Sequence, residues 1–495
     1  MSVFESIAWV ARSESRLIML DVARRVKVTT GAKIYLFCFG PQEMRFYKER
    51  NTEELFADVI DAEVLLSSSK QQGLDESAVM ARAEEIEAEL PRNYNSVVIA
   101  NRHLGRGYAQ GGFYHPRSRY SETTSYTQVV HAYNECFSFW EGEFARLNIT
   151  MVVNGTVEAA VVAQKMGLPF RVLCLSRHKN FHFWAHNEFY EDTGLAEAYQ
   201  KRLQDVTDRR KADAVEPYMA HLVNRTAFVK SASTFKSMVK NIGLQIARHI
   251  YWRLRRYAKA KSYYLTSEIA YYYRVWAQNR QLARLGQPLS SVSGRKFVFF
   301  PLHLEPEIAL QGLSPEYFFQ LTSIACISRD LPAGVVLAVK ETFAGIGRRP
   351  DNFYRQIADL KNVVLLDTME FGAEVVKEAS AVVTINGTAG LEAAQFGKPV
   401  IAFGQHNNYA CMDHVHVVED IHSLRDILAE SLQTDAAQIE DNAECAAVYM
   451  ETVLERSFDL GGYDYVKVSD YSVEAVEAAA DALVSGFQQD ATAVA

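Results

Sequence analysis

A short motif occurs twice in this chain of 495 residues, each time in the same local setting. An apolar, strand-like run leads into Asn-Gly-Thr, a helical segment containing Glu-Ala-Ala follows, and Gly-x-Pro precedes a second apolar run. The two copies span 149–175 and 381–403. A strand, a helix and a second strand form the βαβ unit, which builds a parallel sheet covered by helices. Coincidence between two common units is the alternative, but motif and setting both match. The sequence therefore predicts an α/β chain with two Rossmann-like domains.

Further strand and helix patterns surround both copies. Before the first copy we expect strands at 6–10, 33–39 and 96–100 and a long helix at 126–147. Around the second copy we expect strands at 296–302, 334–339 and 363–366, with helices between them. Such alternation is typical of a doubly wound sheet.

The length of the chain exceeds what one hydrophobic core usually serves. A Gly-, Pro- and Ser-rich break at 286–294 separates the two alternating halves and is the best linker in the chain. We therefore expect an N-terminal Rossmann-like domain at 1–195, a helical segment with a linker at 196–290, a C-terminal Rossmann-like domain at 291–435, and helices at 436–495 that return to the N-terminal domain.

The composition does not suggest a disordered, collagen-like or disulfide-stabilised protein. Hydrophobic residues make up 48% of the chain and charged residues 23%, which is an ordinary globular balance. The six cysteines are widely spaced, so we expect reduced thiols in a reducing compartment. The first 15 residues lack a signal-peptide pattern, and no apolar run approaches the ~20 residues of a membrane helix. We expect a cytoplasmic protein.

The strongest candidate site is the start of the helix in the second copy. Gly387 lets the backbone approach a ligand closely. The first helical amides, at Thr388, Ala389 and Gly390, form the positive end of the helix dipole and therefore suit an anion. Glu392, one turn further, can accept hydrogen bonds from sugar hydroxyls. The alternative is a plain strand–turn–helix in which Thr388 caps the helix.

Polar side chains also follow the neighbouring strands of this half. His303 and Glu307 come after the strand at 296–302, and Lys340 follows the strand at 334–339. Ligands of open α/β sheets bind beyond the carboxyl ends of the strands, so these residues are expected to meet the helix start. Solvent-facing loops are the alternative, and for Arg348 and Arg349 that alternative is equally favoured.

The segment 297–404 resembles the capsular polysaccharide biosynthesis family, whose members include bacterial Kdo transferases with two Rossmann-like domains facing a cleft (GT-B type). The matching stretches are FVFFPLHLEPE, LAVKE and VVTINGTAGLEAAQFGKPVIAFG. The resemblance implies a glycosyltransferase of surface polysaccharide synthesis, with an acceptor in the N-terminal domain. It implies a nucleotide-sugar donor, with CMP-Kdo as one candidate, and no obligatory metal or cofactor. It places His303 and Glu307 in the donor pocket, Lys340 near the donor phosphate, and Thr388, Ala389 and Gly390 at the helix start that binds this phosphate.

One position departs from the family. Where the family often has a His after the Lys-Glu pair, this chain has Thr342. This departure leaves open a different donor or lost activity, and with it a non-catalytic polysaccharide assembly or export factor. A sugar-nucleotide epimerase of the same fold is a further alternative.

The N-terminal half should supply the group that manages the acceptor hydroxyl proton. Glu158 follows the first Asn-Gly-Thr, and His115 lies in a Gly-rich, basic run at 103–119. Carboxylates and imidazoles perform this proton transfer in glycosyl transfer. An ordinary surface histidine is the alternative for His115.

The stretch 230–285 is strongly basic. It holds twelve Lys or Arg and one acid in a chain of net charge -8, with aromatic residues interleaved. Basic and aromatic residues on helices suit an anionic membrane surface. The rival interpretation is a helical insertion whose charges pair with the acidic remainder. We expect no nucleic acid partner, because no known motif supports one.

Overall fold

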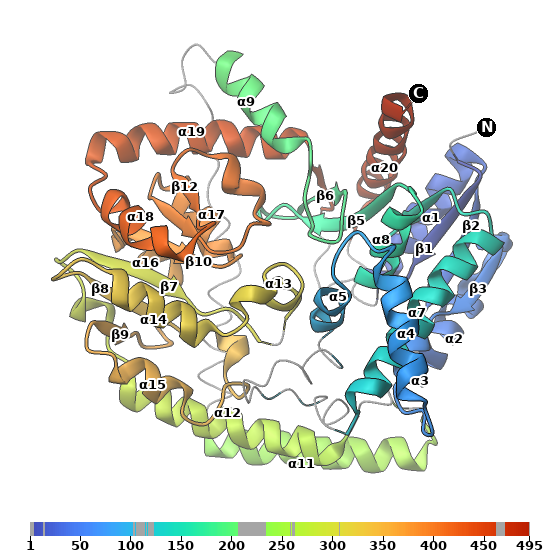
Figure 1. Ribbon diagram of the computed structural model, residues 1–495, viewed down its shortest axis with the longest axis horizontal. Coiled ribbons are helices and arrows are strands. Elements are labelled where there is room, and N and C mark those ends of the chain that lie inside the picture. Colours follow the sequence, from blue (N-terminus) through green and yellow to red (C-terminus); the bar gives the residue numbers. More distant parts are fainter. Residues whose placement is uncertain are drawn as a thin grey trace. The chain divides into compact units, whose positions relative to one another are not determined.

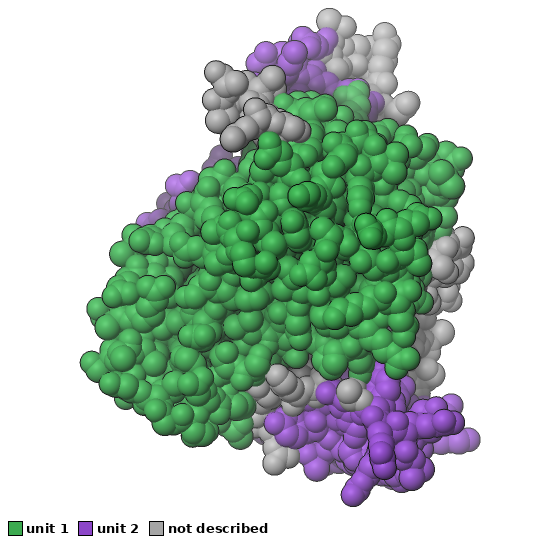
Figure 2. Space-filling view, turned by 90° about the vertical axis from the view of Figure 1, so that its right-hand side faces the viewer, with its two compact units in different colours: residues 1–98, 123–195, 453–495 green, residues 99–122, 196–452 purple. Residues whose placement is uncertain are grey.

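The computed structural model describes residues 4–12, 15–101, 104, 114, 116, 123–205, 234–257, 259, 263–305, 307–461 and 471–494. The chain divides into two compact units. Unit 1 consists of Met1–Val98, Thr123–Leu195 and Val453–Ala495, and unit 2 consists of Ile99–Glu122 and Ala196–Thr452. The three segments of unit 1 form one continuous body, coloured green in Figure 2.

Unit 1 contains a seven-stranded sheet in the order β13-β6-β5-β4-β1-β2-β3. Its strands are β1 (Ser6–Val10), β2 (Lys33–Cys38), β3 (Asp58–Asp61), β4 (Met151–Val153), β5 (Phe170–Leu175), β6 (Phe181–Ala185) and β13 (Phe458–Asp459). The pairs among β1 to β5 are parallel, whereas β6 and β13 add an antiparallel edge. Such an edge on a parallel sheet is common in α/β proteins.

The helices that belong wholly or mainly to unit 1 are α1 (Arg16–Thr30), α2 (Gly40–Arg50), α3 (Val64–Ser68), α4 (Glu76–Glu87), α5 (Tyr94–Ala100), α7 (Tyr126–Arg146), α8 (Val157–Lys165) and α20 (Val473–Val494). The strand predicted at 96–100 is wrong, because these residues form α5. This helix packs on α7, where Tyr94 Oη donates to Val130 O at 2.9 Å. A short apolar run does not distinguish a buried helix from a strand by its periodicity.

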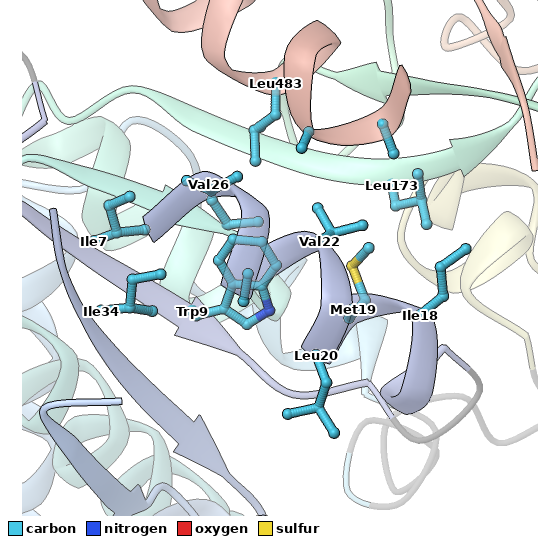
Figure 3. Packing of buried hydrophobic residues seen from close by; sticks show 14 of the residues in the cluster. Ile7, Trp9, Ile18, Met19, Leu20, Val22, Val26, Ile34, Leu173 and Leu483 are labelled. Carbon is cyan, nitrogen blue, oxygen red and sulfur yellow. The ribbon is translucent and has the colours of Figure 1, made fainter. Parts of the chain in front are cut away.

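The core of unit 1 lies between its sheet and helices α1 and α20 (Figure 3). Trp9 of β1 packs against the apolar face of α1, which contributes Ile18, Val22 and Val26. Leu483 of α20 closes this core, and Trp184 Nε1 donates to Ala479 O at 2.9 Å. The C-terminal helix is therefore part of the N-terminal Rossmann-like unit.

Unit 2 contains a six-stranded sheet in the order β12-β11-β10-β7-β8-β9, and every pair is parallel. Its strands are β7 (Phe297–Pro301), β8 (Val336–Lys340), β9 (Val363–Leu365), β10 (Ala381–Thr384), β11 (Val400–Ala402) and β12 (Val415–Val417). The chain moves outward from β7 to β9 and then returns to β10 on the other side of β7. The topological switch point of this sheet therefore lies between β7 and β10.

Helices cover both faces of this second sheet (Figure 1). Unit 2 contains α9 (Leu195–Asp205), α11 (Phe235–Leu254), α12 (Leu265–Leu285), α13 (Ile308–Gln311), α14 (Gln320–Asp330), α15 (Phe353–Asp359), α16 (Gly372–Glu378), α17 (Thr388–Gln395), α18 (Leu424–Ser431) and α19 (Ala436–Glu455). α16 packs beside α17, and α14 beside α18. Together the two units confirm the predicted α/β class with two Rossmann-like domains.

The predicted linker at 286–294 is not a free spacer. Gln287 N donates to Leu365 O at 2.8 Å, and Asp367 N donates to Gln287 O at 2.8 Å, so the chain after α12 runs beside β9. Leu289 N donates to Glu370 Oε1 at 2.9 Å, and Val292 is fully buried. These contacts fasten α12 to the sheet of unit 2.

Within the described residues, no helix combines the length and the apolar character that crossing a bilayer requires.

Candidate active site

The loops after β7 and β10 meet at the switch point of unit 2. His303, two residues beyond β7, accepts a hydrogen bond at Nε2 from Asn386 N (3.2 Å) and lies 3.3 Å from Thr384 Oγ1. Thr384 Oγ1 accepts a hydrogen bond from Gly387 N at 3.0 Å. One histidine therefore ties the first loop to the turn that opens α17. Ligands of open α/β sheets bind at such a crevice.

Helix α17 begins without a side-chain cap. Gly387 is its N-cap residue, and Thr388 is its first helical residue and is exposed. The matching helix of the first copy differs, because there Thr156 is the N-cap and its hydroxyl accepts from Ala159 N at 3.3 Å. The alternative in which Thr388 caps α17 is wrong. Gly390 N donates to Gly387 O at 3.1 Å, so the amides of Thr388 and Ala389 are the ones that suit an anionic ligand.

Two glycines make this turn compact. A Cβ at Gly387 would lie 2.7 Å from Thr384 Oγ1 and 3.0 Å from His303 Nε2. A Cβ at Gly390 would lie 2.5 Å from Tyr409 Oη, which donates to Gly387 O at 3.1 Å. Close packing of the turn, rather than a positive φ, therefore requires glycine at both positions.

A pocket of about 160 Å³ lies at the same edge of the sheet, where β7 and β8 end and α16 and α17 begin. It brings together three of the residues predicted for the donor site, Lys340, Ala389 and Glu392, and it also includes Thr342. We call it the switch-point pocket, and its full lining is Phe299, Pro301, Leu302, Lys340, Glu341, Thr342, Phe343, Glu370, Phe371, Gly372, Ala389 and Glu392.

Lys340 is the buried cation of this pocket. Its Nζ donates to Glu341 O at 3.3 Å and lies 5.1 Å from the centre of the Phe343 ring. Burial lowers the pKa of Lys340 below its ordinary value, while the carboxylates of Glu341, Asp367 and Glu370 oppose that shift. A bound anion would favour the charged ammonium still further.

A buried charge network supports the two loops from behind. The guanidinium of Arg349 binds both carboxylate oxygens of Glu341 at 2.7 and 2.8 Å. It also lies 2.9 Å from Glu305 Oε2 and donates to His303 O at 2.5 Å. Arg349, Glu305 and Glu341 are completely buried. The solvated-loop interpretation of Arg349 is therefore wrong, because this side chain joins the loop after β7 to the loop after β8.

Neutral groups complete the network. Tyr354 Oη donates to Glu341 Oε2 at 2.7 Å. Gln320 accepts from His303 N at 2.7 Å and donates to His303 O and to Glu305 Oε1. One guanidinium faces two carboxylates, so the cluster carries one negative charge in excess when both are ionised. Burial raises the pKa of Glu305 to about 7, and the neighbouring Glu341 adds to this shift although Arg349 and Gln320 oppose it.

Glu307 and the N-terminal candidates lie elsewhere. Glu307 precedes α13, where its carbonyl accepts from Leu310 N at 3.1 Å. Glu158 is buried in α8 beside α7, where its carboxylate adds to the burial-driven rise in the pKa of Tyr133. His115 lies outside the described residues. The catalytic roles of Glu158 and His115 and the donor role of Glu307 stay predictions.

The described part of the chain contains no group of three or more His, Cys, Asp or Glu residues that could hold a metal ion. The predicted independence from metals stays a prediction, since it concerns a reaction rather than a site.

Residues 237–411 match the family described as "Capsule polysaccharide biosynthesis protein". This range contains β7 to β11, α17 and the whole lining of the pocket. The family resemblance predicted from the sequence is confirmed for this range. Comparison of the sequence with characterised proteins finds no match.

Solved structures with a similar arrangement share little sequence with this chain. The KpsC beta Kdo 2,7 transferase of Thermosulfurimonas dismutans is 15% identical over 59% of this chain and 79% of its own, with a TM-score of 0.30. MnaA of S. aureus with UDP is 10% identical over 90% and 92%, with a TM-score of 0.27. UDP-GlcNAc 2-epimerase of Neisseria meningitidis is 9% identical over 91% and 99%, with a TM-score of 0.26. At such scores these likenesses carry no functional conclusion.

Proposed function

We propose that this chain is a glycosyltransferase of capsule polysaccharide biosynthesis that binds a nucleotide-sugar donor at the switch-point pocket of unit 2. The observation that carries the proposal is the meeting of the α17 start with the buried cation Lys340 in one pocket. The match of 237–411 to the capsule family supports it.

The pocket suits the phosphate end of the donor. Helix-start amides and a lysine are two recurrent phosphate-binding groups. Glu392 on the same wall can accept hydrogen bonds from sugar hydroxyls. Pockets for whole drug-sized ligands measure roughly 300–1,000 Å³. A pocket of about 160 Å³ therefore accommodates the phosphate with part of the donor, and the nucleoside extends beyond it.

In the proposed transfer, an acceptor hydroxyl oxygen bonds to the anomeric carbon of the donor sugar. The bond from that carbon to the phosphate oxygen breaks, and the nucleotide leaves with the electron pair. Lys340 and the α17 amides stabilise the charge that gathers on the leaving phosphate. A base takes the hydroxyl proton, and Glu158 and His115 are the candidates. We propose a metal-independent reaction with CMP-Kdo as the first donor to test.

The proposal is tested by nucleotide release from a panel of CMP- and UDP-sugars, with and without glycan acceptors. Release that depends on an acceptor and is lost in Lys340→Met supports the transferase. Conversion of the donor sugar without acceptor identifies an epimerase instead. Nucleotide binding with no turnover of any donor favours the assembly or export factor.

A second part of the proposal is contact with an anionic membrane through α11. This helix exposes a row of apolar side chains, including Phe235 (61% exposed), Val239, Ile250 and Leu254 (78% exposed). Lys236, Lys240 and Arg253 are exposed on the same helix. Exposed apolar residues flanked by cations are typical of helices that lie in a membrane interface. Such contact would bring a cytoplasmic enzyme to a lipid-linked acceptor.

Co-sedimentation with vesicles tests this contact. We expect binding to vesicles that contain anionic lipid and loss of binding in Ile250→Glu/Leu254→Glu. The exposed Val473 of α20 provides the control Val473→Glu. Equal sedimentation of all three proteins, or binding to neutral vesicles alone, would contradict the assignment.

A further inference from the structure

An open groove of about 640 Å³ lies between α12 and α15, which pack against one another in unit 2 (Figure 1). Its residues are Trp276, Ala277, Arg280, Gln281, Arg284, Leu285, Arg355, Ala358 and Asp359. None of these residues lines the switch-point pocket. The groove is therefore a separate site, and its volume falls in the range of ligand-binding clefts.

Three arginines dominate the charge of the groove. Arg280, Arg284 and Arg355 are exposed, and none of them makes an ion pair within the described ranges. Asp359 is the one acid among the lining residues. By contrast, Arg274, further back on α12, pairs with Asp351 at 3.0 Å. The groove thus keeps an excess of positive charge that no ion pair among the described residues neutralises.

The cationic side chains on α12 form a line with an aromatic ring. Trp276, Arg280 and Arg284 are spaced by four residues and share one face of the helix. They cover ~12 Å along the axis, because each helical residue rises ~1.5 Å. The guanidinium of Arg280 lies 5.3 Å from the Trp276 ring centre. Arg355 faces this line from α15. A linear ligand with repeated anionic groups matches such a line.

We infer that the groove binds an acidic oligosaccharide, whose carboxylates pair with Arg280, Arg284 and Arg355 while a sugar ring packs against Trp276. The planar guanidinium donates to both oxygens of a carboxylate, and the indole ring supplies an apolar surface. The inference rests on the proposed function, because it identifies the groove as a holding site for an anionic glycan acceptor.

The groove adjoins the apolar row of α11, because the ring centres of Phe235 and Trp276 lie 5.8 Å apart, but the chemistry of the two surfaces differs. A bilayer is met by protruding apolar side chains, and these lie on α11. The groove is concave, and five of its nine lining residues are polar or charged. A single glycan strand fits a concave charged site, whereas a flat headgroup layer does not reach into it.

The test is calorimetric titration of the full chain with tetragalacturonate, which carries carboxylates, and with neutral maltotetraose. We expect the acidic glycan to bind, with affinity that falls as salt rises. The affinity of the double variant Arg280→Gln/Arg284→Gln for the acidic glycan should be at least about tenfold lower than that of wild type. Arg425→Gln is the matched control, because Arg425 is an exposed arginine on α18 that lines neither site. It should remain within about twofold of wild type.

Nucleotide binding separates this inference from the proposed function. The double variant should keep the thermal stabilisation that nucleotides give to wild type, since the switch-point pocket is intact. Equal affinity for the neutral glycan, or equal loss in Arg425→Gln, would overturn the inference. Tighter binding of a single-stranded oligonucleotide or of anionic vesicles with the same arginine dependence would also overturn it.

Discussion

The Nε2 atom of His303, beyond β7, accepts a hydrogen bond from the backbone amide of Asn386, beyond β10, at 3.2 Å. The two strands are neighbours at the switch point of the unit 2 sheet, where the order in which the chain adds strands reverses. Because Nε2 accepts, the neutral ring carries its proton on Nδ1. His303 thus holds the turn before α17 in place, next to the start of the candidate donor-phosphate site.

Replacing His303 should loosen this turn. His303→Ala leaves the buried Asn386 amide without its acceptor, which costs about 1–3 kcal/mol of unfolding free energy. Nucleotide affinity should fall as well, because the α17 start is no longer fixed. Chemical denaturation and nucleotide titration measure the two effects. His422→Ala, at an exposed histidine of the same unit, should change neither.

Replacing Lys340 should weaken nucleotide binding without lowering the stability of the folded protein. Its burial lowers its pKa, which shows that the charged ammonium is costly in the folded protein. Lys340→Met keeps the side-chain length and removes the charge. We expect equal or higher melting temperature and at least about tenfold weaker nucleotide binding. Lys361→Met, at an exposed lysine, should alter neither property. A large loss of stability in Lys340→Met would assign Lys340 to the fold instead.

Glu305 should make stability depend on pH. Its pKa rises from 4.5 to about 7 on folding, so the folded state binds this proton more tightly. Its contribution to the unfolding free energy is therefore complete below pH 4.5 and is lost as pH rises through 7, by up to about 3 kcal/mol. Glu305→Gln lacks this titration. Its unfolding free energy relative to wild type should increase across the same window, and parallel pH profiles would contradict the assignment.

Arg349 should be among the least replaceable residues of unit 2. Arg349→Leu leaves Glu305 and Glu341 buried without their cation, which costs about 3–5 kcal/mol. Arg355→Leu, at an exposed arginine nearby in sequence, should cost less than about 0.5 kcal/mol. Urea unfolding measures both, and a similar effect of the two changes would refute the role of the network.

Much of the fold could be predicted from local patterns. The strands β1, β5 and β10 are apolar runs bounded by turn residues, and the repeated Asn-Gly-Thr units mark both βαβ crossovers. The sequence of α5 does not distinguish a helix from a strand, because its seven residues carry no distinct period. The sequence gives little sign of β6, because its run, Phe-His-Phe-Trp-Ala, is short and follows a polar turn.

The site was predictable where it depends on strand ends and not where it depends on distant partners. Lys340 ends β8, Ala389 and Glu392 lie in α17 beyond β10, and all three line one pocket. Arg349 follows β8 by nine residues, and only the fold shows that it returns between Glu305 and Glu341. Charged residues in loops after buried strands are the signal that could have indicated such a network.

The most direct measurement is the thermal stability of wild type and Lys340→Met with a panel of nucleotides. At 100 times its dissociation constant, a bound nucleotide adds about 2.7 kcal/mol to the stability of the folded state. We predict selective stabilisation of wild type by one nucleotide class, CMP for a Kdo-type donor, and its loss in Lys340→Met but not in Lys361→Met. Absence of stabilisation by every nucleotide, or equal stabilisation of all three proteins, would contradict donor binding at the start of α17.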